Sequence, residues 1–103
     1  MKAVNKLVRD NIPNIIIDNK EIPLYYKLED DKVYYKELCK KLIEETKEFM
    51  DSDEVEELAD ICEVIIAILQ FKNIDLAEFK KIMNKKTMNI GNFSGRTFLL
   101  GIK

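Results

Sequence analysis

The order of apolar and polar positions predicts a helical protein built around one long hairpin. Between residues 30 and 71, apolar side chains recur at intervals of three and four, as on one face of a helix. The first helix is expected to begin at Asp30 or Asp31 and to reach about Met50. A turn at 51–53 follows, and Asp53 with Glu56 forms a capping-box pattern that predicts the start of a second long helix, ending near residue 71.

Shorter elements are predicted on both sides of this hairpin. Pro13 suits the first turn of a short helix that ends near Asn19. Asp75 and Glu78 repeat the capping pattern before a third helix, which should loosen after Lys86.

Two stretches are β-prone rather than helical. Residues 22–28 contain Pro23 and two tyrosines, and residues 97–102 are rich in residues that favour strands. Together they predict a short two-stranded β element beside an antiparallel, all-α helical bundle. A chain of 103 residues holds one hydrophobic core, so residues 1–103 are expected to form a single domain.

Composition narrows the possible chemistry. Apolar residues make up 47% of the chain, which suits a folded protein, and the net charge of −2 provides no field to attract polymeric nucleic acid. There is no histidine, so histidine catalysis and histidine–metal sites are excluded. Two cysteines form neither a disulfide framework nor a CxxC zinc motif. The chain begins without a signal-peptide pattern and has no apolar run that would span a bilayer, so we expect a cytoplasmic protein without a membrane partner.

An acidic constellation on the hairpin is the main candidate for chemistry. The first helix carries Glu44-Glu45-x-x-Glu48 and the second carries Glu57-x-x-Asp60. Residues that lie level in an antiparallel helix pair have a constant sum of residue numbers, and Glu48/Glu57 shares its sum with Glu45/Asp60. Four carboxylates are therefore predicted to face one another as two rungs between the helices.

The direction of these carboxylates indicates a cation site. The exposed stripe of the second helix should run through Glu56 and Glu63, which leaves Glu57 and Asp60 pointing towards the first helix. Buried carboxylates repel one another, and we expect no Lys or Arg on these faces to neutralise them. A hard divalent cation with oxygen ligands, Mg²⁺ or Mn²⁺, would do so. The alternative is that these acids are simply solvated.

The acidic pattern resembles the signature of the all-α nucleoside triphosphate pyrophosphohydrolases, the MazG-like superfamily. The N-terminal segment from Asn5 to Pro13 is similar to the opening of a small single-domain branch of that group, described as phosphoribosyl-ATP pyrophosphohydrolase-like. Gly91-Asn92-Phe93 is similar to the Gly-Gly-Phe near the end of that branch. The resemblance covers nearly the whole chain.

The resemblance implies a helical bundle that forms a homo-oligomer, most simply a dimer, and Mg²⁺-dependent cleavage between the α- and β-phosphates of a nucleotide. The products would be a monophosphate and pyrophosphate. Carried over by position, four residues would be metal ligands and Glu44 would orient water: the ligands are Glu45, Glu48, Glu57 and Asp60.

The phosphates of such a substrate also require protein cations. The basic residues that could bind them lie near both ends of the chain: Lys6, Arg9, Lys85, Lys86 and Arg96. Each could equally be an ordinary surface charge. No P-loop or dinucleotide-binding glycine motif is present.

Two other functions remain open on the sequence. The chain could be a regulatory module that binds nucleotide and metal with little or no turnover, or a structural helical oligomer without a site. Oligomerisation is expected in every case, because the second helix is apolar around most of its circumference between Leu58 and Leu69.

Overall fold

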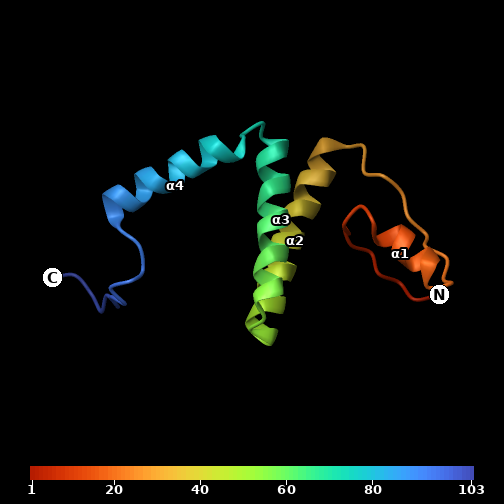
Figure 1. Ribbon diagram of the computed structural model, residues 1–103, viewed down its shortest axis with the longest axis horizontal. Coiled ribbons are helices and arrows are strands. Elements are labelled where there is room, and N and C mark those ends of the chain that lie inside the picture. Colours follow the sequence, from red (N-terminus) through yellow and green to blue (C-terminus); the bar gives the residue numbers. More distant parts are fainter.

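The computed structural model describes residues 1–103 and contains four helices and no strand (Figure 1). The helices are α1 (Ile12–Asp18), α2 (Asp31–Ser52), α3 (Val55–Phe71) and α4 (Leu76–Ile90). The predicted all-α class is confirmed. None of the four helices is long and apolar enough to cross a membrane.

The expected β element is absent. Residues 22–28 and 97–102 contain no strand, and their backbones exchange no hydrogen bonds. The two segments lie towards opposite ends of the long axis of the molecule, which extends 59 Å (Figure 1). Since strand pairing requires a partner at about 4.8 Å, residues with strand preference stay unpaired here.

The helix starts follow local capping chemistry. Pro13 occupies the first turn of α1, as predicted. The Asp30 side chain accepts hydrogen bonds from the backbone N–H groups of Lys32 and Val33 at the start of α2. Asp75 accepts one from Glu78 at 2.7 Å and begins α4. Each cap satisfies backbone donors that the first helical turn leaves without partners.

The turn between α2 and α3 differs from the prediction. Asp53 does not cap α3; it adopts a left-handed conformation, with φ of 57°, and its N–H donates to Phe49 at the end of α2. Glu54 precedes α3 without a side-chain cap, although its N–H donates to Ser52 Oγ. Asp tolerates the left-handed region better than most residues, so the same residue type serves helix ends as well as helix starts. The capping box at Asp53 was wrong, yet the hairpin it was meant to delimit is present.

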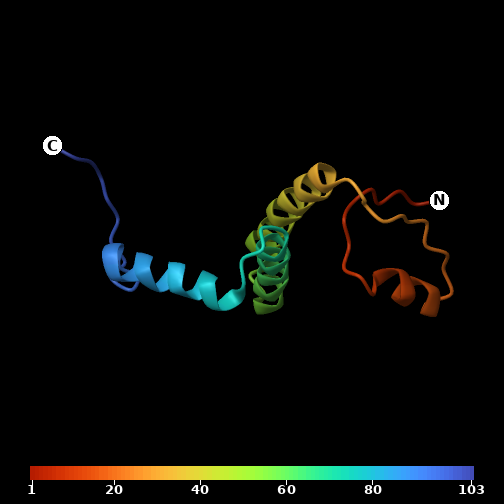
Figure 2. The same ribbon diagram turned by 90° about the horizontal axis from the view of Figure 1, so that it is seen from above.

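The α2–α3 hairpin holds the core. Figures 1 and 2 show the two helices side by side along their length. The buried apolar residues, Leu38, Val64 and Leu69, all lie on these two helices. The Phe71 ring lies 5.9 Å from the Tyr34 ring and 5.1 Å from the Tyr35 ring, centroid to centroid. Tyr34 and Phe71 have the same residue-number sum as Glu45 and Asp60, so this contact confirms the predicted register.

The other two helices leave the hairpin largely uncovered. α1 contacts no other helix, and α4 contacts only α3, from which it extends away (Figures 1 and 2). α4 also continues to Ile90, past the predicted loosening after Lys86. The radius of gyration is 18.0 Å, whereas a compact domain of this length has about 13 Å. Antiparallel packing within one chain is therefore limited to α2 and α3.

Candidate functional site

Three carboxylates meet between α2 and α3. Glu45 projects from α2, and Glu57 and Asp60 project from the first turns of α3. One oxygen of each side chain lies within 4.8 Å of the corresponding oxygens of the other two. The i, i+3 spacing of Glu57 and Asp60 places both on the face of α3 that meets α2. The predicted rung formed by Glu45 and Asp60 is thus present.

Burial makes this cluster costly without a cation. Glu45 is 7% exposed and is the one charged residue among the four buried residues of the chain. Oε2 of Glu45 and Oε2 of Glu57 are both buried and have no hydrogen-bond partner. A buried polar group without a hydrogen-bond partner costs about 1–3 kcal/mol, and a charged group costs more. A divalent cation with oxygen ligands would satisfy both atoms, so the residues present fit such an ion.

Glu48, the fourth predicted ligand, has a different position. Its side chain is exposed, and it is not part of the close group of Glu45, Glu57 and Asp60. It still acts on the site: burial raises the pKa of Glu45, and the neighbouring Glu48 raises that pKa further, against the opposing effect of Lys41. Glu48 therefore lies at the solvent edge of the cluster.

Lys41 corrects the expectation that no cation faces these acids. It stands four residues before Glu45, and its Nζ lies 3.3 Å from Glu45 Oε1 and 2.8 Å from Glu44 Oε2. Its side chain is 15% exposed. Burial alone would lower the pKa of Lys41, but its contacts with Glu44 and Glu45 outweigh burial and hold the pKa above its ordinary value. The i, i+3 and i, i+4 spacing was visible in the sequence and would have identified this residue.

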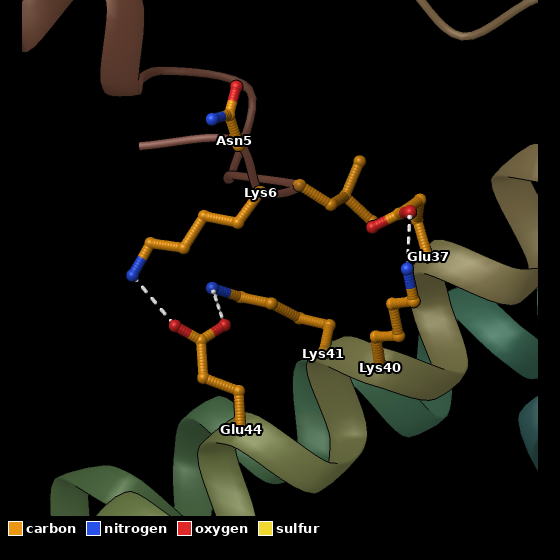
Figure 3. Close-up of a pocket in the computed structure, with 7 residues that line it drawn as sticks. Asn5, Lys6, Glu37, Lys40, Lys41 and Glu44 are labelled. Atoms are coloured by element: carbon orange, nitrogen blue, oxygen red, sulfur yellow. Dashed lines mark hydrogen bonds and ion pairs between the residues drawn. The ribbon is translucent and has the colours of Figure 1, made fainter. Parts of the chain in front are cut away.

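Glu44 lies beside the cluster with both carboxylate oxygens paired. Lys6 Nζ donates to Oε1 at 2.7 Å and Lys41 Nζ donates to Oε2 at 2.8 Å (Figure 3). Burial would raise the pKa of Glu44, but the hydrogen bonds from Lys41 and Lys6 bring it below its ordinary value. Glu44 is consequently held ionised and is oriented by two cations.

Two of the predicted phosphate-binding residues lie at this site. Lys6 contacts Glu44, and Arg9 Nη1 lies 3.7 Å from Asp60 Oδ1. The N-terminal segment thus reaches acids of both hairpin helices. The side chains of Arg9 and Asp60 are 57% and 39% exposed, so solvent reaches the cluster from this side. A ligand could approach the carboxylates between the N-terminal segment and α3.

The other predicted basic residues lie elsewhere within the chain. Lys85 and Lys86 are exposed on α4, and Arg96 is exposed in the segment that follows it. Because α4 extends away from the hairpin (Figure 1), one chain does not bring these three residues to the carboxylates.

Comparison with protein-family models, curated proteins and solved structures finds no match to this chain. The geometry and chemistry of its own residues therefore carry the functional argument.

Proposed function

We propose that this chain is a Mg²⁺-dependent nucleoside triphosphate pyrophosphohydrolase, which cleaves between the α- and β-phosphates to release pyrophosphate. The observation that carries the proposal is the group formed by Glu45, Glu57 and Asp60, in which two buried oxygens have no partner. The resemblance of the acidic pattern to the MazG-like signature supports the choice of reaction, which is cleavage between the α- and β-phosphates. Mn²⁺ would suit the same oxygen ligands.

The residues divide into two roles. Glu45, Glu57 and Asp60 would hold the cation, with Glu48 joining them from the exposed edge. Glu44 is ionised and accepts two hydrogen bonds from lysines, so it has the charge needed to orient a water molecule. No cysteine or serine is needed as a covalent nucleophile.

A bound divalent cation would neutralise charge on the phosphate oxygens and lower the pKa of a bound water. Two of the protein's own cations lie beside these acids and would bind the substrate phosphates. Arg9 lies beside Asp60 at the open edge, where a guanidinium can bind phosphate oxygens with two parallel hydrogen bonds. Lys6 lies beside Glu44 and supplies a second positive charge.

The direct experiment measures pyrophosphate release from a panel of nucleoside triphosphates and phosphoribosyl-ATP in the presence of Mg²⁺. Glu45→Gln and Asp60→Asn should each lower kcat/KM by at least about a hundredfold, since outer-shell changes at metal sites already cost about 10–100-fold. Glu63→Gln is the matched control: Glu63 is exposed on the same helix as Asp60 and should leave the rate unchanged. Circular dichroism would verify that each variant stays helical.

Two results would refute this proposal. Release of pyrophosphate that is unaffected by Glu45→Gln and Asp60→Asn would remove the carboxylates from the reaction. Tight binding of Mg²⁺ and nucleotide without any product would instead identify a regulatory binding module.

We also propose that the working form is a homo-oligomer, with a dimer as the smallest assembly. The surface of the single chain is 9739 Å², whereas a compact monomer of 12.1 kDa exposes roughly 6,000 Å². The excess of about 3,700 Å² is larger than one partner loses in most obligate dimers. Much of it is apolar, because Leu76, Ile82 and Met83 of α4 are 61%, 46% and 53% exposed.

A further inference from the structure

A basic pocket lies next to the carboxylate cluster, between the N-terminal segment and α2. It has a volume of about 260 Å³ and is lined by polar residues from both segments: Asn5, Lys6, Glu37, Lys40, Lys41 and Glu44 (Figure 3). Three ammonium groups and two carboxylates line it, and Lys41 also pairs with Glu45, which lies outside the lining. Among these residues only Lys6 was expected to bind phosphate.

The lysines of the pocket already hold an anion. The Glu44 carboxylate is bound on one oxygen by Lys6 and on the other by Lys41, at 2.7 and 2.8 Å. Figure 3 shows the two lysine side chains converging on this carboxylate from different segments. The third lysine, Lys40, pairs with Glu37 at 3.3 Å. Because 60% of the Lys40 side chain is exposed, this pair is weak and Lys40 can exchange Glu37 for another anion.

The backbone bends at Asn5, at the N-terminal side of this arrangement. It adopts a positive φ of 50°, in the left-handed region that Asn tolerates better than most residues. The bend precedes Lys6 directly, and Lys6 then reaches across to α2 (Figure 3).

The pocket is also joined to the carboxylate cluster. Lys41 Nζ contacts Glu44 on one side and lies 3.3 Å from Glu45 Oε1 on the other. An anion bound by Lys6 and Lys41 would consequently lie next to the carboxylates of Glu45, Glu57 and Asp60. A polyphosphate chain has the chemistry to bridge such a pair of sites, since its oxygens bind both ammonium groups and hard cations.

We propose that the pocket formed by Lys6, Lys40 and Lys41 binds the pyrophosphate portion of the substrate, with Glu44 occupying the same lysines when no phosphate is bound. This inference rests on the proposed function for the identity of the substrate. The volume agrees with a fragment of that size, because pockets that hold whole drug-sized ligands measure about 300–1,000 Å³.

If phosphate replaces Glu44 on the lysines, substitution of a lysine and substitution of Glu44 should change the affinity for phosphate in opposite directions. Substitution of a lysine removes a ligand of the anion and weakens its binding. Substitution of Glu44 removes the competing carboxylate and strengthens it. If these residues only stabilised the structure, replacing a lysine or replacing Glu44 would break the same ion pairs. Both substitutions would then change the affinity for pyrophosphate in the same direction.

The experiment is isothermal titration calorimetry with inorganic pyrophosphate in the presence of EDTA, so that no metal contributes to binding. Lys6→Met and Lys41→Met should each weaken binding about tenfold, the effect of one charge-assisted contact. Glu44→Gln should tighten binding about threefold, as expected for removal of a partly exposed charge pair. Lys47→Met is the control, because Lys47 is exposed on the same helix and lies outside the pocket. Its affinity should match that of the unaltered protein.

The proposal is overturned if the unaltered protein does not bind pyrophosphate, if the lysine variants match Lys47→Met, or if Glu44→Gln binds more weakly. If Lys41→Met fails to fold, Lys6→Met decides the matter, because Lys6 belongs to the N-terminal segment and is 46% exposed. Hydrolysis of triphosphates with Mg²⁺ is measured separately. Pyrophosphate binding without hydrolysis would refute only the proposed function, and hydrolysis with unaltered pyrophosphate affinity in all variants would refute only the pocket.

Discussion

The α2–α3 hairpin and the α4 region are both helical, but only the hairpin packs within the chain. All four buried residues lie on α2 or α3, whereas α4 has none. Both regions have an apolar stripe at helical spacing, so sequence pattern alone does not separate them. What separates them is a partner: the two-residue connection at Asp53 and Glu54 brings α3 back along α2, while α4 leaves the hairpin at its far end. A short connection that reverses the chain therefore determines which amphipathic helix can pack its apolar face against the preceding helix.

The largest effect is expected from a change within the hairpin core. Leu38 is 3% exposed between α2 and α3. Leu38→Ala should lower the free energy of unfolding by about 2–5 kcal/mol, because a cavity replaces packed side-chain atoms. Met50→Ala truncates a residue of similar size at a position of α2 that is 76% exposed, and should change stability by less than about 0.5 kcal/mol. Urea denaturation measures both, and equal losses would show that the hairpin does not supply the stability of the fold.

A smaller effect is expected on α4, and it should concern association rather than folding. Ile82 is 46% exposed on the apolar stripe. Ile82→Lys should raise the dissociation constant of the homo-oligomer at least about tenfold, because it would place a charge in an apolar contact. Asn84→Lys, on the other side of α4, is the control and should leave association unchanged. Sedimentation velocity over a range of concentrations measures both, and a monomer at every concentration for the unaltered chain would contradict the assembly.

The smallest effect is expected from the titration of the carboxylates without metal. Burial and the neighbouring Glu48 raise the pKa of Glu45 above its ordinary 4.5. Between 4.5 and this raised pKa the folded state binds more protons than the unfolded state, so the free energy of unfolding should fall as the pH rises through that window. Glu45→Gln should remove this decrease, which gives the variant a relative gain in stability at neutral pH.

Glu44 provides an internal comparison for the same measurement. Its pKa is lowered, so its contribution to stability is present above 4.5 and is lost as the pH falls through its folded-state pKa. Glu44→Gln should therefore change the acid side of the curve, whereas Glu45→Gln changes the other side. Urea titrations in EDTA at fixed ionic strength would test this, and parallel curves for the unaltered protein and Glu45→Gln would contradict the burial of a charged carboxylate.

How far the sequence predicted this molecule depends on how local each feature is. The cap at Asp75 and the Pro13 turn depend on neighbouring residues alone, and they were predicted correctly. The structure selects Asp30 as the cap of α2 from the two predicted candidates, Asp30 and Asp31. Glu45 and Asp60 could be placed opposite each other because a tight turn sets the register of a helical hairpin. Asp53 was misassigned because Asp favours both helix starts and the left-handed bend that ends α2.

Features that depend on distant parts of the chain were not predictable in the same way. Residues 22–28 and 97–102 have strand preferences, but the fold places them far apart, so they do not pair as strands. The contact of Lys6 with Glu44 spans 38 positions and creates the basic pocket. Lys41 is the exception, because its spacing of three and four residues from Glu44 and Glu45 is local and could have been predicted. Lys85, Lys86 and Arg96 lie on or after α4, which one chain does not bring to the carboxylates, so their role in phosphate binding stays a prediction.

The proposed function requires a cation between α2 and α3. The most direct measurement is anomalous X-ray scattering from crystals of the protein grown with Mn²⁺, recorded at the manganese edge. We expect one or more peaks within coordinating distance of the carboxylate oxygens of Glu45, Glu57 and Asp60. Peaks located only elsewhere, with these three side chains turned into solvent, would contradict it.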